Sequence, residues 1–243
     1  WDLPYLFENL KQGFKAFKEE NVGQLHCFGI DTWGVDYGLL DKNGHLLGNP
    51  RSYRYATDED VAETHKIVDF PTLYSRTGIG SMPFNTVYQL ARRKAEGDVS
   101  LANAKTMLLM PDLLAYFLTG KKGVEYTMAS TCQLLDPFKR DWSVEVFERL
   151  GLPKKLMAPI ERPGTLRGTL LPDIARECGV EEIPVYAVGG HDTASAVAAV
   201  PARDADFAYI SSGTWSLLGA ELQKPLCAEG VMNANYTNEG GVD

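Results

Sequence analysis

The chain has 243 residues, of which 44% are hydrophobic and 23% are charged. This composition is typical of a soluble globular protein, and the length fits one large domain or two unequal ones. Because 24 Lys and Arg stand against 32 Asp and Glu, the net charge is −8, and no basic cluster follows a helix or loop. We therefore expect no nucleic acid and no anionic membrane surface among the partners.

The cysteines and the chain ends bear on the compartment and on completeness. Cys27, Cys132, Cys178 and Cys227 form no C-x-x-C pair, so we expect core thiols in a reducing, cytoplasmic compartment. No apolar run reaches the length of a membrane span, and no signal-peptide pattern occurs. The chain starts at Trp1 without Met and stops just after NEGG, so we expect a piece of a longer protein.

Taken in chain order, the first predicted element is an amphipathic helix over residues 3–20, where apolar residues recur at helical intervals. Residues 24–33 predict a buried strand that runs into a loop, and residues 36–48 a hairpin around Asn43-Gly44. Residues 58–69 predict a solvated, acidic helix start. Residues 106–120 predict a strand and then a helix that Pro111 opens and Gly120 ends.

The second half predicts short helices over 143–150 and 171–179 and a strand over 184–188. Asp192 or Thr193 is a natural N-cap for a small-residue helix over 194–200. Residues 207–222 predict a strand, a turn and a second strand. Strands that alternate with helices and hairpins predict an α/β architecture with a mixed sheet. The polar residues 201–206 predict the domain boundary.

Three familiar site motifs fail. GIGSMP (78–83) has no third glycine and no preceding strand, so a Rossmann site is excluded. TGKKG (119–123) lacks both the earlier glycine and the Ser or Thr of a P-loop. No serine lies in a G-x-S-x-G context, so triad hydrolysis has no support.

Three other segments share one pattern, a strand that ends in a loop of small and polar residues: GIDTWGVD (29–36), GGHDTAS (189–195) and SSGTWS (211–216). In an α/β sheet such loops gather at the carboxyl ends of the strands, where ligands bind. Asp192 has the chemistry of a general base, Gly213 and Thr214 can hold a phosphate, and Thr32, Trp33 and Gly34 can form one wall of a polyol pocket.

Each of these residues also has a structural interpretation. Asp192 can simply cap the helix, and His191 can be a hydrogen-bonded structural histidine. Trp33 can belong to the core, and Gly213 can supply a positive φ to a hairpin turn. Spacing alone does not decide between the two sets.

The same segments carry a family resemblance. Together with PFNTVYQL (83–90), LLMPDLLAYFLTG (108–120), EYTMASTCQL (125–134) and the terminal TNEGG, they resemble the FGGY carbohydrate kinases in order and spacing, in particular the bacterial members that act on L-rhamnulose. The resemblance implies a ribonuclease H-like (actin-like ATPase) fold. It divides the chain into an N-terminal sugar-binding domain over 1–202, without its first strands, and the start of the C-terminal ATP-binding domain over 203–243.

The resemblance also implies a role for each site residue. Asp192 is implied as the catalytic base that takes the proton of the ketose hydroxyl as it attacks the γ-phosphoryl group of ATP. His191, Thr193 and Gly34 are implied at the sugar. Gly213 and Thr214 are implied at the ATP phosphates, and Mg²⁺ is implied with the nucleotide.

Alternatives remain at this stage. L-fuculose or another ketose competes as substrate, and a non-catalytic actin-like module that binds sugar or nucleotide competes as a class. YRYATD (53–58) has Tyr55 and Thr57 where the family usually has Asp and Arg, which leaves the identity of the sugar open. The glycine-rich phosphate-binding hairpin of the family is missing before Trp1, so we expect the 243-residue chain alone to be inactive.

Overall fold

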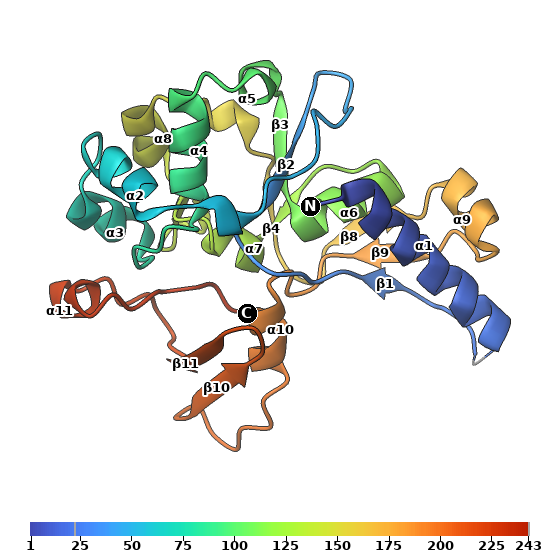
Figure 1. Cartoon of the computed structure of the whole chain (residues 1–243). Helices are drawn as coiled ribbons and strands as arrows, with labels where there is room; N and C mark the ends of the chain where they lie inside the picture. Colours follow the sequence, from blue (N-terminus) through green and yellow to red (C-terminus); the bar gives the residue numbers. More distant parts are fainter. Residues whose placement is uncertain (22, 243) are drawn as a thin grey trace.

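The computed structural model describes residues 1–21 and 23–242 (Figure 1). The predicted α/β architecture is confirmed, with strands distributed over several small sheets. The helices are α1 (Leu3–Glu20), α2 (Asp58–His65), α3 (Phe70–Thr77), α4 (Thr86–Ala95), α5 (Val99–Asn103), α6 (Met110–Thr119), α7 (Tyr126–Ser130), α8 (Val144–Leu150), α9 (Pro172–Cys178), α10 (Asp192–Ala198) and α11 (Glu229–Asn233), with 3-10 turns at Tyr53–Tyr55 and Lys154–Leu156. The strands are β1 (Phe28–Gly29), β2 (Tyr37–Leu40), β3 (Thr106–Leu109), β4 (Val124–Glu125), β5 (Leu135–Asp136), β6 (Asp141–Trp142), β7 (Ile160–Glu161), β8 (Leu166–Thr169), β9 (Pro184–Tyr186), β10 (Ala208–Ser212) and β11 (Ser216–Ala220).

Helix α1 has the predicted bounds because both of its ends are signalled locally. The Asp2 side chain accepts a hydrogen bond from the N–H of Tyr5, and the helix ends at Asn21 in the left-handed conformation. Its apolar face buries Leu3 and Phe14. Phe14 packs on Phe28 of β1, with ring centroids 4.7 Å apart, so α1 covers the edge of a sheet.

That sheet has the order β1-β9-β8, with β1 parallel to β9 and β8 antiparallel to it. The prediction of a buried strand over 24–33 is wrong in length and burial, since β1 has two half-buried residues. Among the described residues, β1 is an edge strand whose ladder with β9 has two residue pairs. The parallel pairing still brings the carboxyl ends of β1 and β9 to one edge of the sheet.

The main core forms around β2 and β3, which are antiparallel, and β3 leads into α6. The prediction for 106–120 is confirmed, because α6 follows β3 directly and ends at Gly120 with φ 72°. In the predicted 36–48 hairpin, the return segment makes a single bridge, Leu40 to Leu46. The principal partner of β2 is β3, from a distant part of the chain.

The remaining helices lie close to their predicted positions. Thr57 caps α2 in a reciprocal box with Asp60, and three acidic residues fill the first turn. Helices α8 and α9 and the β10-β11 hairpin occur as predicted. Figure 1 shows α2, α3, α4 and α8 at one end of the body, α1 and α9 at the other, and the hairpin below α10.

Two composition-based expectations can be compared with the structure. All four cysteines are free thiols, and Cys132 and Cys178 are buried, but Cys27 is exposed just before the edge strand β1. The expectation of a core thiol is therefore wrong for Cys27. None of the helices formed by the described residues is long and apolar enough to cross a membrane.

Candidate active site

Two of the three predicted loops lie side by side. Thr32 and His191 form a parallel bridge that continues the pairing of β1 with β9. The Thr32 N–H donates to the Gly190 carbonyl and the Asp192 N–H donates to the Thr32 carbonyl, both at 2.9 Å. The expected meeting of GIDTWGVD with GGHDTAS at the strand ends is thus present in the structure.

Asp192 does not cap its helix. The prediction that Asp192 or Thr193 is the N-cap is wrong, because the His191 carbonyl accepts the first helical hydrogen bond, from Ser195, and His191 is the N-cap. The Asp192 Oδ1 atom accepts instead from the N–H of Thr193 at 2.7 Å. Its side chain is 58% exposed, and no described residue bonds Oδ2. One carboxylate oxygen is therefore available to a ligand.

His191 lies between two carboxylates. Its Nδ1 is 3.0 Å from Glu239 Oε2 and its Nε2 is 3.5 Å from Asp192 Oδ1. Burial acts to lower the pKa of His191, but the neighbouring carboxylates, Glu239 foremost, outweigh burial and the pKa is raised. His191 is thus a buried imidazole whose charged form is stabilised by two neighbouring carboxylates, one of them Asp192.

The predicted sugar wall, Thr32, Trp33 and Gly34, is anchored by a hydrogen bond from Trp33 to Asp36. The Trp33 and Trp1 indole N–H groups both donate to Asp36 Oδ2, and the two rings are in tilted contact with centroids 4.3 Å apart. Asp36 is fully buried, and burial raises its pKa to about 6. Trp33 is half-buried. It packs against the core, as its structural interpretation held, and part of its ring remains accessible to a ligand.

Gly34 lies in close contact with Thr131. A Cβ atom at this position would lie 3.0 Å from Thr131 Cγ2, and Thr131 Oγ1 accepts from the next N–H, that of Val35. The Thr32 hydroxyl donates to the Trp33 carbonyl at 3.0 Å. The backbone of this loop is therefore packed directly against the end of α7.

The third predicted loop, with Gly213 and Thr214, is the tight turn between β10 and β11. Gly213 lies in a hairpin turn, as the structural interpretation held, but it does not adopt the positive φ expected of it. A Cβ there would have no neighbour within 4 Å. Trp215 packs on Phe84 with centroids 5.7 Å apart, but among the described residues no hydrogen bond or ion pair joins this turn to residues 190–193.

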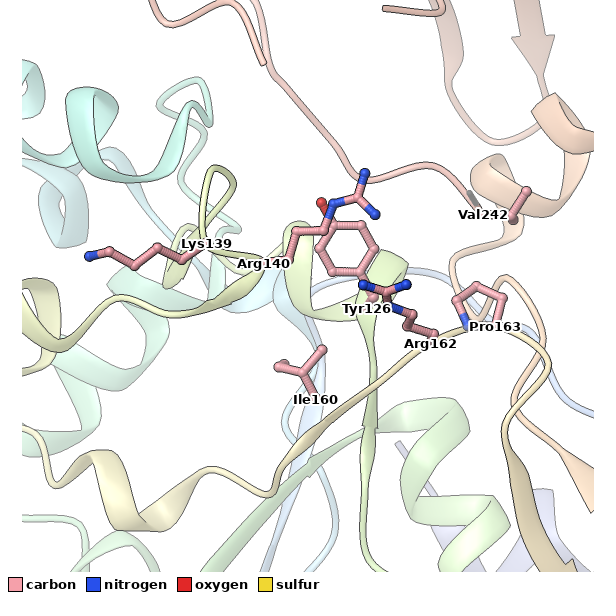
Figure 2. Close-up of a pocket in the computed structure, with 7 residues that line it drawn as sticks. All are labelled: Tyr126, Lys139, Arg140, Ile160, Arg162, Pro163 and Val242. Atoms are coloured by element: carbon pink, nitrogen blue, oxygen red, sulfur yellow. The ribbon is translucent and has the colours of Figure 1, made fainter. Parts of the chain in front are cut away.

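Two cavities lie outside the predicted residues. One of about 150 Å³ is formed by the seven residues of Figure 2, where the Arg140 and Arg162 side chains lie near the Tyr126 ring. Another of about 300 Å³ includes Tyr55 and three arginines. Thr57, the second departure from the family pattern, is accounted for as the cap of α2.

Sequence reasoning missed three residues at this site: Glu239, Glu125 and Thr127. Each contacts residues 190–191 from a distant segment. All three lie in segments that carry the family resemblance, which is the one signal that could have indicated them.

The comparison with known proteins decides the family. Residues 1–199 match the N-terminal domain of the FGGY family of carbohydrate kinases. The chain belongs to this family. Among curated FGGY proteins, it is 42% identical to a rhamnulokinase of Bacteroides thetaiotaomicron, covering all of this chain and 50% of that protein. It is 41% identical to a rhamnulokinase of Yersinia pestis, covering 49% of that protein. The chain thus spans about half the length of the curated relatives it matches.

Solved structures give the same fold. A xylulose kinase from Lactobacillus acidophilus superposes with a TM-score of 0.82 at 17% identity, over 92% of this chain and 46% of that chain. A carbohydrate kinase from Novosphingobium aromaticivorans superposes with a TM-score of 0.78 at 26% identity, over 93% of this chain and 49% of that chain. The expected ribonuclease H-like, actin-like fold of the FGGY kinases is confirmed.

Proposed function

We propose that this chain is the sugar-binding part of an ATP-dependent kinase that phosphorylates the 1-hydroxyl of L-rhamnulose, with Asp192 as general base. The observation that carries the proposal is the position of the Asp192 carboxylate. It stands exposed beside the 32–34 loop with one oxygen unbonded, and Asp192 is not the N-cap of α10. The two rhamnulokinase relatives, 42% and 41% identical over the whole chain, support the sugar.

In this reaction the protein forms no covalent bond to the substrate and acts mainly by positioning and by proton transfer. Asp192 takes the proton of the sugar hydroxyl while that oxygen attacks the γ-phosphorus of ATP. The bond from the γ-phosphorus to the bridging oxygen breaks, and ADP leaves with the electron pair. Trp33 and Gly34 would line the sugar, with His191 and Thr193 beside the base and the Thr32 backbone holding the two loops together.

The nucleotide would meet the β10-β11 turn. Gly213 leaves its backbone open to approach, and the Thr214 hydroxyl and N–H suit a phosphate oxygen. The described residues contain no group of three His, Cys, Asp or Glu that could hold a metal. Mg²⁺ would come with the nucleotide phosphates, which supply most of its ligands in kinases, and no step here passes through the metal.

We further propose that residues 1–202 form the sugar-binding domain and that 203–243 begin the ATP-binding domain. The family match ends at residue 199, close to this boundary. Because the chain spans about half of its relatives, we expect activity at their full length and none from the 243 residues alone. Sugar-dependent ADP release by the purified chain would contradict this division.

The test is a ketose panel with ATP and Mg²⁺ on the full-length protein, wild type against Asp192→Asn. We expect L-rhamnulose to give the highest kcat/KM and Asp192→Asn to lose about 10²-fold or more in kcat, with sugar affinity kept. Asp173→Asn, in the exposed first turn of α9, is the matched control and should keep its activity. Preference for L-fuculose would show that the substrate is another ketose used by this family. Full activity of Asp192→Asn would show that Asp192 is not the general base.

A further inference from the structure

We propose that Glu125 and Thr127 are positioning residues of the transfer reaction, which aim the Asp192 carboxylate by holding the two N–H groups that precede it. This inference rests on the proposed function. Glu125 is a buried carboxylate, 1% exposed, at the start of α7. Its oxygens accept from the N–H of Thr127 at 2.8 Å, from the N–H of Met128 at 3.1 Å and from the N–H of Gly190 at 2.9 Å.

Thr127 extends this arrangement by one residue. Its hydroxyl donates to Glu125 Oε2 at 2.5 Å and accepts from the N–H of His191 at 3.1 Å. Because the hydroxyl proton is committed to a carboxylate, the oxygen lone pairs face His191. Glu125 and Thr127 therefore present two acceptors to two successive N–H groups, at positions 190 and 191.

The opposite side of the same three residues is held by backbone. Thr32 donates to the Gly190 carbonyl and accepts from the Asp192 N–H. A Cβ at Gly190 would lie 2.8 Å from Met128 Cγ and 3.0 Å from Glu125 Oε2, so glycine permits this close approach. Residues 190–192 are thus fixed between the side chains of α7 and the loop that forms the proposed sugar wall.

The chemistry requires a carboxylate at position 125. All of its hydrogen-bond partners are donors, three N–H groups and one O–H. The NH₂ group of a glutamine would face at least one of them, and the 190–191 loop would have to move to avoid it. A displacement of about 1 Å at a reacting group can cost about 10²-fold in rate. The expected loss is therefore in kcat rather than in binding.

Thr127→Val and Thr127→Ser on the full-length kinase test the proposal, because valine removes the hydroxyl at nearly constant shape and serine restores it. We expect Thr127→Val and Glu125→Gln to lower kcat roughly 10- to 100-fold, with the KM for sugar changed much less. Thr127→Ser should recover most of the kcat that valine loses. Thr64→Val is the matched control, since Thr64 is equally buried and its hydroxyl bonds the Asp60 carbonyl within α2.

Stability and placement are separated by melting curves on the same variants. Thr64→Val should lower the melting temperature and keep kcat per folded molecule. If Thr127→Val behaves like Thr64→Val, or if serine recovers nothing, the positioning role is wrong. Should Glu125→Gln fail to fold, the Thr127 pair still decides. Asp192→Asn in parallel separates the two proposals: if it is inactive while Thr127→Val is fully active, positioning alone fails, and if it is active the base assignment fails.

Discussion

The Nδ1 atom of His191 lies 3.0 Å from a carboxylate oxygen of Glu239, although Nδ1 makes no well-directed hydrogen bond. The two residues that flank Glu239 are both hydrogen-bonded to the body of the protein. Asn238 Nδ2 donates to the Gly78 carbonyl at 2.9 Å, and the Gly240 N–H donates to Ser130 Oγ at 2.8 Å. The TNEGG segment therefore brings a negative charge to the residue that precedes the proposed base.

The first prediction concerns this ion pair. Glu239→Gln should lower the pKa of His191, because it removes the foremost group that opposes burial. The raised pKa makes the charged imidazole stabilising at low pH, and that stability is lost as pH rises through the pKa in the folded state. The variant should lose this dependence. The measurement is an NMR titration of the four histidines.

Glu229→Gln serves as the control, since the Glu229 carboxylate has no ion pair within the described part of the chain. Its histidine titrations should match the wild type. An unchanged His191 titration in Glu239→Gln would show that the pair does not persist in solution.

The second prediction concerns Asp36. Burial raises its pKa from an ordinary 3.8 to about 6, so the folded state holds this proton more tightly than the unfolded state does. Stability should fall as pH rises from about 4 to about 6. Asp36→Asn should flatten that part of the curve of stability against pH, because an amide does not titrate. The amide oxygen can still accept from an indole N–H, so the contact itself is kept. Urea unfolding across this pH range is the measurement.

Asp41→Asn is the comparison for Asp36. Backbone hydrogen bonds, that of His45 foremost, lower the pKa of Asp41, so its stabilising effect is lost below the tested range. This variant should leave the slope between pH 4 and 6 unchanged. An equal slope of stability against pH in Asp36→Asn and wild type would show that Asp36 does not cause the fall between pH 4 and 6.

The third prediction concerns Arg167, which is buried and contacts Asp112 Oδ1 at 2.5 Å and Glu161 Oε2 at 2.8 Å. Burial raises the pKa of Asp112 to about 7, although Arg167 acts against it. Arg167→Met should cost about 3–5 kcal/mol, because it leaves a buried charge unpaired. The loss should grow above pH 7, because Asp112 ionises there in the wild type, whereas without Arg167 its pKa is higher still and the folded variant keeps the proton.

A double-mutant comparison checks the cause. Adding Asp112→Asn to Arg167→Met should restore part of the lost stability, because no buried charge is then left at position 112. Arg176→Met, in an exposed pair with Asp173, should change the free energy of unfolding by less than about 1 kcal/mol. A double variant no more stable than the single one would point to lost packing instead.

The fourth prediction compares two site glycines. Gly34→Ala should destabilise the protein by about 1–3 kcal/mol, because its Cβ would press on Thr131. Gly213→Ala should stay within about 0.5 kcal/mol, because its Cβ enters open space. If the turn holds ATP phosphates, Gly213→Ala should instead raise the KM for ATP. Melting curves and ATP kinetics together check the pair, and equal stability losses would contradict it.

Several elements could be predicted because their signals are local. Helix α6 has Pro111 in its first turn and Gly120 as its C-cap, and the dihedral preferences of those two residues explain both ends. The β10-β11 hairpin follows likewise from its alternating strands and short turn. The prediction of the start of α10 is wrong: the helix spans Asp192–Ala198 instead of 194–200, two residues earlier, with its N-cap at His191. The backbone N–H of Asp192 is bonded to the Thr32 carbonyl, from the loop after β1.

The sequence by itself determined the family, the α/β class and the candidate loops 29–36 and 189–195, because motif order and local backbone preferences are written along the chain. Tertiary structure alone decided that Asp192 is free of capping, that His191 carries a raised pKa and that Glu125 holds the loop. The reason is that burial and charge are properties of neighbours in space. Thr32, Glu125 and Glu239 reach residues 190–192 from three distant segments, and no local pattern encodes that meeting.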